Sequence, residues 1–398
     1  MNQRRRLLAT ACALPLVACG GSGGDAPAPP PPAATRRWKM GFSPNPPRFT
    51  VQAVLQGIDT WSPRAELAII HEEVPWTDLL ACQTPDAILT RDKTQLVAYL
   101  KGKGLALVFM GDLTDGLDRT QDAPQLRAAG RSITEPAVQR LYRDWMLAVD
   151  RVLQPVLLGL AAETNLIRAA APGLYPAVRQ TANDTAAALR AAGRATPLMA
   201  SVQVEVAWGR LGGNGSFVGI APDLADFPFV QTLGLSSYPY FGWSQPEDLP
   251  TDYYTRLVAS RPALPVMVTE GGWASASAGT IASSPELQAR YVTRHAALLD
   301  AAGAAGWLQL VFADLDLAAL PPPLPANLPL FASIGLADSD FRAKPALAAW
   351  DALYARRLSS SSTTPLTVSA AAAISPPLMT SPPSSTPSAS PITGFTKL

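Results

Sequence analysis

The chain has 398 residues, and 48% of them are hydrophobic, so it can bury a large core in one barrel or in two smaller domains. Its 32 Lys and Arg residues balance 31 Asp and Glu residues, and the formal charge of +1 gives no field that would attract nucleic acid. The body of the chain has one cysteine, Cys82, and its two histidines, His71 and His295, are far apart, which argues against a disulfide framework and a zinc site.

The first 18 residues have the pattern of an export signal. Three arginines at positions 4–6 precede an apolar stretch that is too short to span a membrane permanently. The run Leu16 to Cys19 resembles the bacterial lipobox, which implies cleavage before Cys19, a lipid on its sulfur and a place in the cell envelope, with the outer membrane favoured. An ordinary secretory signal with a chance cysteine is the alternative.

Two segments of biased composition flank the central part of the chain. Residues 19–35 are rich in Gly and Pro and predict a tether. Residues 359–398 are rich in Ser, Thr, Pro and Ala and predict a disordered tail. The GGSGG of the tether matches a serine-hydrolase pattern, but neither a strand nor a helix flanks it, so we reject that reading. The folded domain should cover residues 36–358.

Eight apolar runs alternate with amphipathic stretches in this domain. They are WKMGFS, AELAIIH, LALVFM, PVLLGLAAE, PLMASVQV, VQTLGLSSY, PVMVTE and WLQLVFA, beginning near residues 38, 65, 105, 155, 197, 230, 265 and 307. Short apolar strands separated by helices predict an α/β fold with a parallel sheet, and eight strands are what a closed (β/α)₈ TIM barrel needs. An open doubly wound sheet is the competing architecture, but no glycine-rich loop follows the first strand.

Two of the intervening helices have clear end signals. One should begin at Thr134, followed by Glu135 and Pro136. Another should be capped by Ser284 and end at Gly303.

Two glutamates stand at predicted strand ends, where TIM barrels assemble their active sites. Glu163 ends the fourth strand and Glu270 ends the seventh. A carboxyl pair across a barrel mouth can cleave a glycosidic bond, one group protonating the leaving oxygen while the other attacks the sugar. Either glutamate could instead cap backbone amides or pair with an arginine. Glu205 is a spare candidate, although its position suggests a polar rim residue.

The segments LGLAAETN, LGLSSYPYF and VMVTEGGW resemble the clan A glycoside hydrolases, and within them the endo-β-1,4-galactanase-like group, glycoside hydrolase family 53. This resemblance implies a general acid/base at Glu163, a nucleophile at Glu270 and retention of anomeric configuration. It also implies that Tyr238 and Tyr240 line the site.

One position departs from the clan pattern. The clan has asparagine immediately before its acid/base glutamate, where it binds the sugar 2-hydroxyl, and this chain has Ala162. The loss of that hydrogen bond puts the galactanase assignment, and even catalysis, in question. Asn165 could compensate if its amide faced the cleft.

Further candidates would bind the sugar itself. Trp76 and Trp273 could stack on sugar rings if they are exposed at the mouth, and His71 could contact a hydroxyl or act electrostatically. Each could equally be a structural residue. Asp112, Asp115 and Asp118 lie in one acidic loop, but their spacing lacks the calcium-loop pattern, so a solvated loop is expected.

Three functions remain open from the sequence. The first is a cell-envelope glycoside hydrolase that acts on a β-linked poly- or oligosaccharide and needs no cofactor or metal. The second is a non-catalytic carbohydrate-binding barrel, and the third is an envelope-anchored interaction module. Fold alone does not separate them.

Overall fold

A computed structural model describes residues 35–359, and within them eight parallel strands close into a barrel. Each strand pairs with the next in chain order until β9 pairs with β2. The strands are β2 (Lys39–Phe42), β3 (Leu67–Glu73), β4 (Ala106–Asp112), β5 (Leu157–Gly159), β6 (Leu198–Gln203), β7 (Thr232–Ser237), β8 (Val266–Gly271) and β9 (Gly306–Gln309). All eight predicted strands are present, so the TIM barrel is confirmed and the open sheet is wrong.

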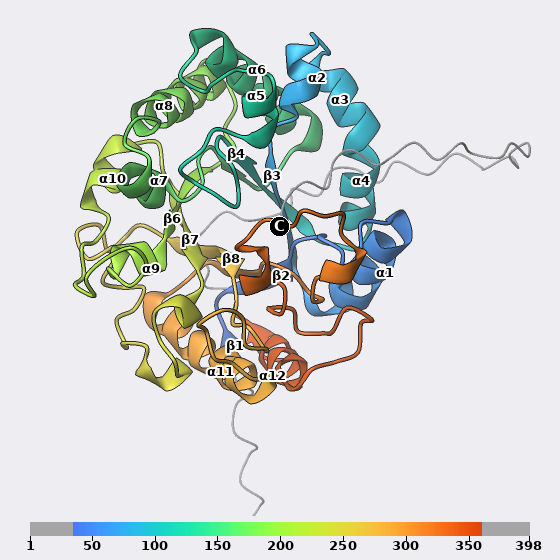
Figure 1. Ribbon diagram of the computed structural model, residues 1–398, viewed down its shortest axis with the longest axis vertical. Helices are drawn as coiled ribbons and strands as arrows, with labels where there is room; N and C mark the ends of the chain where they lie inside the picture. The colour runs from blue at the N-terminus through green and yellow to red at the C-terminus, as the bar shows by residue number, and fades with distance from the viewer. Residues whose placement is uncertain (1–34, 360–398) are drawn as a thin grey trace, which may run out of the picture. The chain divides into compact units, whose positions relative to one another are not determined.

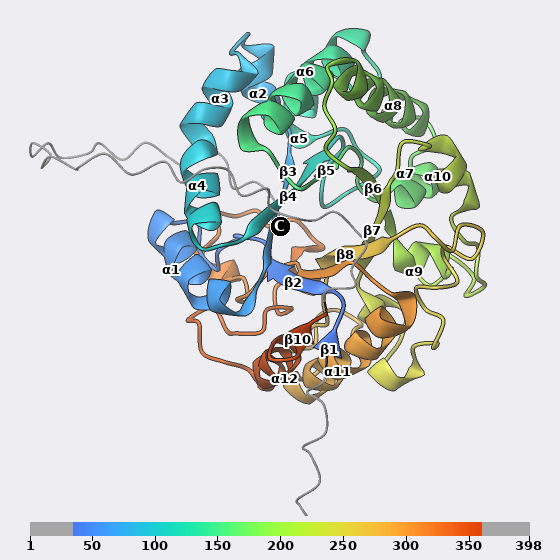
Figure 2. The same cartoon turned by 180° about the vertical axis from the view of Figure 1, so that it is seen from behind.

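Helices form a ring around the barrel, as Figures 1 and 2 show from its two ends. The α-helices are α1 (Val51–Trp61), α2 (Trp76–Leu80), α3 (Pro85–Asp92), α4 (Thr94–Gly102), α5 (Pro124–Ala128), α6 (Pro136–Leu153), α7 (Thr164–Ala170), α8 (Tyr175–Ala191), α9 (Val204–Ala207), α10 (Ala221–Asp226), α11 (Pro285–Ala302) and α12 (Pro345–Tyr354). Short 3₁₀ turns are η1 (Ser62–Arg64), η2 (Pro239–Phe241), η3 (Pro246–Asp248), η4 (Leu317–Ala319) and η5 (Leu328–Leu330).

The end signals of α11 act as predicted. The Ser284 side chain accepts a hydrogen bond from the Leu287 amide, and Gly303 ends the helix in the left-handed conformation. Helix α6 begins two residues later than expected, at Pro136, with Glu135 as its N-cap. The Glu135 carboxylate accepts from the Ser132 amide instead of capping the helix.

The interior of the barrel is filled by side chains. A buried cluster of small and aliphatic residues occupies it, namely Leu67, Ile69, Ala106, Val108, Met110, Leu157, Ala162, Met199, Met267, Ala305 and Leu308. Packing is so close that a Cβ atom added at Gly159 would lie 2.3 Å from Sδ of Met110. Because the barrel is a packed core with no pore, a functional site has to lie at one of its mouths.

The two ends of the described chain pair with each other outside the barrel. β1 (Thr35–Arg36) and β10 (Arg357–Leu358) form a two-stranded parallel sheet, visible beside α12 in Figure 2. The Arg36 guanidinium donates to Glu66, at 3.1 Å for Nη1, and Glu66 immediately precedes β3. This small sheet therefore lies at the amino-terminal end of the barrel strands.

Several predictions concern residues outside the described range. The signal peptide (1–18), Cys19, the tether (19–35) apart from Thr35, and the tail (359–398) apart from Ser359 all lie there. Among the helices of residues 35–359, none has the length and apolar character to cross a membrane.

Candidate active site

Glu163 and Glu270 lie at the carboxyl-terminal mouth of the barrel and line the same small cavity. Glu163 follows β5 and begins α7, whereas Glu270 belongs to β8. The cavity has a volume of about 70 Å³. Its lining consists of Asn45, His71, Gly116, Leu117, Glu163, Tyr238, Glu270, Leu310 and Phe331. The barrel topology thus brings the two predicted carboxyl groups together from strands that are 107 residues apart in sequence.

The backbone of Glu163 adopts an unusual conformation. Its φ of 48° lies in the left-handed region, which costs a non-glycine residue energy and is enriched at active sites. Two serines hold it there: its amide donates to Oγ of Ser201 at 2.9 Å, and Oγ of Ser236 donates to its Oε1 at 2.6 Å. The side chain is therefore fixed from the neighbouring strands β6 and β7.

Glu270 is held from both sides of β8. A bulge between Leu235 and Ser236 shifts the register so that Ser236 pairs with Glu270. On the other side, Nδ1 of His71 lies 2.8 Å from Oε2 of Glu270. Burial alone would raise the pKa of Glu270, but the charge and hydrogen bond of His71, with Arg119 and Ser236, outweigh it and lower that pKa.

Arg119 and Asp112 complete a ring of contacts around the cavity. Nε of Arg119 donates to Oε2 of Glu163 at 2.6 Å, and its Nη1 donates to both carboxylate oxygens of Asp112 at 2.6 Å. Asp112 lies 3.4 Å from Nε2 of His71, which in turn contacts Glu270. All five side chains of this ring are at most 9% exposed. Glu163 and Glu270 are thus linked through Arg119, Asp112 and His71.

The predicted aromatic residues have different positions. Tyr238 lines the cavity, where its ring packs edge-on against Phe331 at 5.1 Å. Tyr240 does not line the cavity, and its hydroxyl donates a hydrogen bond to the Leu330 carbonyl. Trp76 and Trp273 are buried in the core, 0% and 1% exposed, so neither is the exposed platform that we expected.

Asn165 does not replace the missing asparagine. Its side-chain nitrogen Nδ2 donates to the backbone carbonyl of Gln203 at 2.8 Å, and its Oδ1 accepts from the backbone amide of Gln203 at 2.7 Å. Both ends of the side chain are therefore bonded to β6, away from the cavity, and the expected compensation for Ala162 is wrong. Ala162 itself packs into the barrel interior.

Sequence reasoning missed Arg119, Ser236 and Asn45. Ser236 stands inside a strand segment whose tyrosines drew attention, and Asn45 follows the first barrel strand. The strand-end rule could have suggested both. Arg119 lies in a loop, and no local pattern marks it as a partner of Glu163.

The acidic loop after β4 is structured. Oδ1 of Asp115 accepts from the amides of Leu117 and Asp118, and Asp118 accepts from the Thr120 amide. Asp112 is committed to Arg119, as described above. Of the three aspartates, Asp112 and Asp115 are buried and Asp118 is exposed, so the expectation of a solvated loop holds for Asp118 and is wrong for the other two. In the range 35–359, no group of three or more His, Cys, Asp or Glu side chains is arranged to hold a metal ion.

Glu205 is not the rim residue that its sequence position suggested. It is fully buried below the mouth and accepts hydrogen bonds from Nε2 of Gln203 at 2.6 Å, from the Tyr238 amide at 3.1 Å and from the Tyr253 hydroxyl. Burial raises its pKa to about 7, although these hydrogen bonds oppose the shift. Glu205 thus supports the backbone of Tyr238 from beneath and does not line the cavity.

Comparisons with known proteins support the fold. No protein-family model matches the chain, and a search of curated proteins finds no match. Among solved structures, the β-glucuronidase from Ruminococcus gnavus in complex with uronic isofagomine matches with a TM-score of 0.53 at 14% identity, over 80% of this chain and 51% of that one. Its complex with D-glucaro 1,5-lactone matches with a TM-score of 0.52 at 13% identity, over 80% and 50% of the two chains. The chain spans about half the length of these proteins, and at such identity the likeness establishes the TIM-barrel fold alone.

Proposed function

We propose that the protein is a retaining glycoside hydrolase that cleaves β-linked glycosides, with Glu163 as general acid/base and Glu270 as nucleophile. The observation that carries the proposal is that both carboxyl groups line one small cavity at the carboxyl-terminal mouth of the barrel. The TIM-barrel likeness to β-glucuronidases agrees with this reaction class.

The environment of Glu270 fits the role of nucleophile. Glu270 has a lowered pKa and remains ionised, as a nucleophile must. Its carboxylate would attack the anomeric carbon as the glycosidic C–O bond breaks, while Glu163 gives its proton to the departing oxygen. Glu163 would then take a proton from water, whose oxygen displaces Glu270 from the sugar and restores the original anomer.

The small size of the cavity favours retention over inversion. Retaining enzymes keep their two carboxyl groups about 5 to 5.5 Å apart, whereas inverting enzymes need about 6.5 to 9.5 Å for an intervening water. Glu163 and Glu270 both line one cavity of about 70 Å³, so we expect the shorter separation.

Hydrolysis of a panel of β-glycosides tests the proposal. The panel would hold 4-nitrophenyl glycosides and oligosaccharides of β-galactan, β-glucan, mannan and xylan. We expect activity with retention by NMR in the wild type. Glu163→Ala and Glu270→Ala should each lose at least about a thousandfold in kcat/KM. Glu247→Gln, an exposed glutamate of η3, is the matched control and should keep full activity.

Rescue by azide assigns the two roles. With an activated substrate, Glu270→Ala should give a glycosyl azide of inverted configuration, because azide replaces the missing nucleophile. Glu163→Ala should give the retained azide, because the covalent intermediate still forms on Glu270. Inverted products from the wild-type enzyme, or full activity in either alanine variant, would contradict the assignment.

A non-catalytic carbohydrate-binding barrel is the second candidate. Ala162 removes the usual partner of the sugar 2-hydroxyl, and the Asn165 amide is bonded to β6. Sugar binding without hydrolysis of any panel member would favour this function.

We also propose that the protein is exported and lipid-anchored through Cys19 in the cell envelope, with the outer membrane favoured. The supporting observation is the run Leu16 to Cys19 after a short apolar segment.

A further inference from the structure

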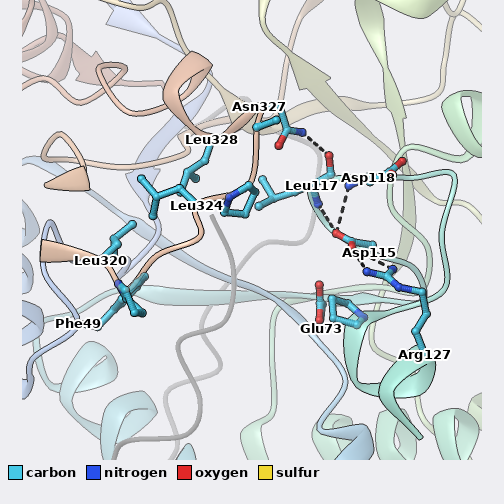
Figure 3. A pocket seen from close by; sticks show the side chains of 14 residues that line it. Phe49, Glu73, Asp115, Leu117, Asp118, Arg127, Leu320, Leu324, Asn327 and Leu328 are labelled. Atoms are coloured by element: carbon cyan, nitrogen blue, oxygen red, sulfur yellow. Dashed lines mark hydrogen bonds and ion pairs between the residues drawn. The ribbon is translucent and has the colours of Figure 1, made fainter. Parts of the chain in front are cut away.

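A second, larger cleft adjoins the small cavity. Its volume is about 750 Å³, within the usual range for ligand sites, whereas the cavity at the carboxyl groups is far smaller than that range. Leu117 lines both. One wall comes from residues 115–127, after β4, and the opposite wall from residues 320–328, after β9 (Figure 3). Leu117 therefore marks the place where the cleft lies next to the cavity at Glu163 and Glu270.

The polar side chains of the cleft are committed to its own walls. Asp115 pairs with both terminal nitrogens of Arg127 at 3.1 Å, as the dashed lines in Figure 3 show. Asn327 donates to the Leu117 carbonyl and so ties the two walls together. Oε1 of Glu73 accepts from the Gly116 amide at 3.2 Å. These hydrogen bonds hold the two loops in place, so the polar groups that make them are already engaged within the protein.

The remaining surface of the cleft is apolar. Leu320, Leu324 and Leu328 project from one wall and face Leu117 on the other (Figure 3). Of the 14 lining residues one is aromatic, Phe49, which is 41% exposed. Sites for a run of sugar rings combine many hydrogen-bonding groups with flat aromatic faces. This cleft has one aromatic face, its polar side chains are hydrogen-bonded to its own walls, and its leucines suit a flexible or flat hydrocarbon.

We infer that the cleft binds the apolar aglycone, an alkyl or aryl group, of an amphiphilic glycoside. The inference rests on the proposed function and names its substrate class. Leu117 lies two residues before Arg119, which contacts Glu163, the proposed acid for the leaving oxygen. An apolar group bonded to that oxygen would therefore enter the cleft beside Leu117.

The test compares alkyl glycosides of one sugar. We would measure kcat/KM for methyl, butyl and octyl β-glycosides below their micellar concentrations, with a β-linked oligosaccharide of the same sugar alongside. Wild type should gain about threefold to fourfold per buried methylene. Leu324→Gln and Leu320→Gln should pull the octyl-to-methyl ratio towards one. Val218→Gln, a 67% exposed position outside the cleft, controls for general detergent effects and should keep the wild-type ratio.

Calorimetric binding of the same glycosides separates this inference from the proposed function. Tighter binding of octyl than methyl glycoside, weakened by Leu324→Gln, would uphold the cleft assignment even if wild type hydrolyses nothing, in which case the proposed function fails alone. Hydrolysis that favours the oligosaccharide, without dependence on alkyl length in rate or affinity, would overturn the cleft assignment and leave the hydrolase standing.

Discussion

Nδ1 of His71 lies 2.8 Å from Oε2 of Glu270, and the other ring nitrogen faces Asp112 at 3.4 Å. The imidazole is thus placed between two carboxylates, and its charge and hydrogen bond help to lower the pKa of Glu270 against the opposing effect of burial. Of the two roles that the sequence suggested for His71, sugar contact and electrostatic stabilisation, this geometry favours the second, with His71 as a positioning residue for the proposed nucleophile.

His71→Asn should reveal this role in the pH dependence of hydrolysis. Asparagine can still donate a hydrogen bond but carries no charge, so the pKa of Glu270 should rise and the acidic limb of kcat/KM should move to higher pH. We expect kcat/KM at neutral pH to fall about tenfold to a hundredfold, as for loss of a charge-assisted hydrogen bond. An acidic limb that stays in place would show that the imidazole only fills space.

Arg119 should be essential because it neutralises two buried carboxylates at once. Arg119→Met removes the guanidinium that Asp112 and Glu163 share, and we expect the free energy of unfolding to drop by about 3 to 5 kcal/mol in urea titrations. Adding Asp112→Asn should recover part of this loss, since one uncompensated charge is removed. Strictly additive losses in the double variant would contradict the ion-pair account.

Glu205 should make stability depend on pH. Its pKa is raised to about 7 in the folded protein, so the folded state binds the extra proton between roughly pH 4.5 and 7. The stability it contributes is fully present below the unfolded pKa and is lost as pH rises through the folded pKa, by roughly 3 kcal/mol at most. Glu205→Gln should flatten this slope in urea unfolding between pH 5 and 8. A slope equal to that of wild type would rule out Glu205 as its source.

Cys19→Ser tests the proposed anchor. The variant should no longer incorporate labelled palmitate and should leave the detergent phase on partition. Cys82→Ser, which changes the exposed cysteine in the turn between α2 and α3, should behave as wild type. A Cys19→Ser protein that is still extracted only by detergent would argue against lipidation.

The barrel could be predicted because each strand is a local feature. Runs such as LALVFM are apolar throughout, as strands buried on both faces must be, and helices such as α11 have end signals within a few residues of their ends. The same local logic singled out Glu163 and Glu270, because each stands at the end of an apolar strand, and the structure brings both to one cavity.

The rest of the site depends on contacts that local patterns do not encode. Arg119 meets Glu163 across 44 residues of sequence, and Ser236 meets it across 73. Trp76 and Asn165 failed as predictions for a related reason: residue type says what a side chain could bind, whereas its neighbours in space decide what remains available. The indole of Trp76 is buried in the core, and the side-chain amide of Asn165 is hydrogen-bonded to the backbone of β6.

The pairing of β1 with β10 places both ends of the described chain at the same end of the barrel. Both strands lie at the amino-terminal end of the barrel, where the Ser359 amide donates to the Arg36 carbonyl at 2.8 Å. Glu163 and Glu270 lie at the opposite, carboxyl-terminal mouth of the barrel. A fusion partner joined directly to either end of the described domain would therefore attach at the end of the barrel that lies away from Glu163 and Glu270.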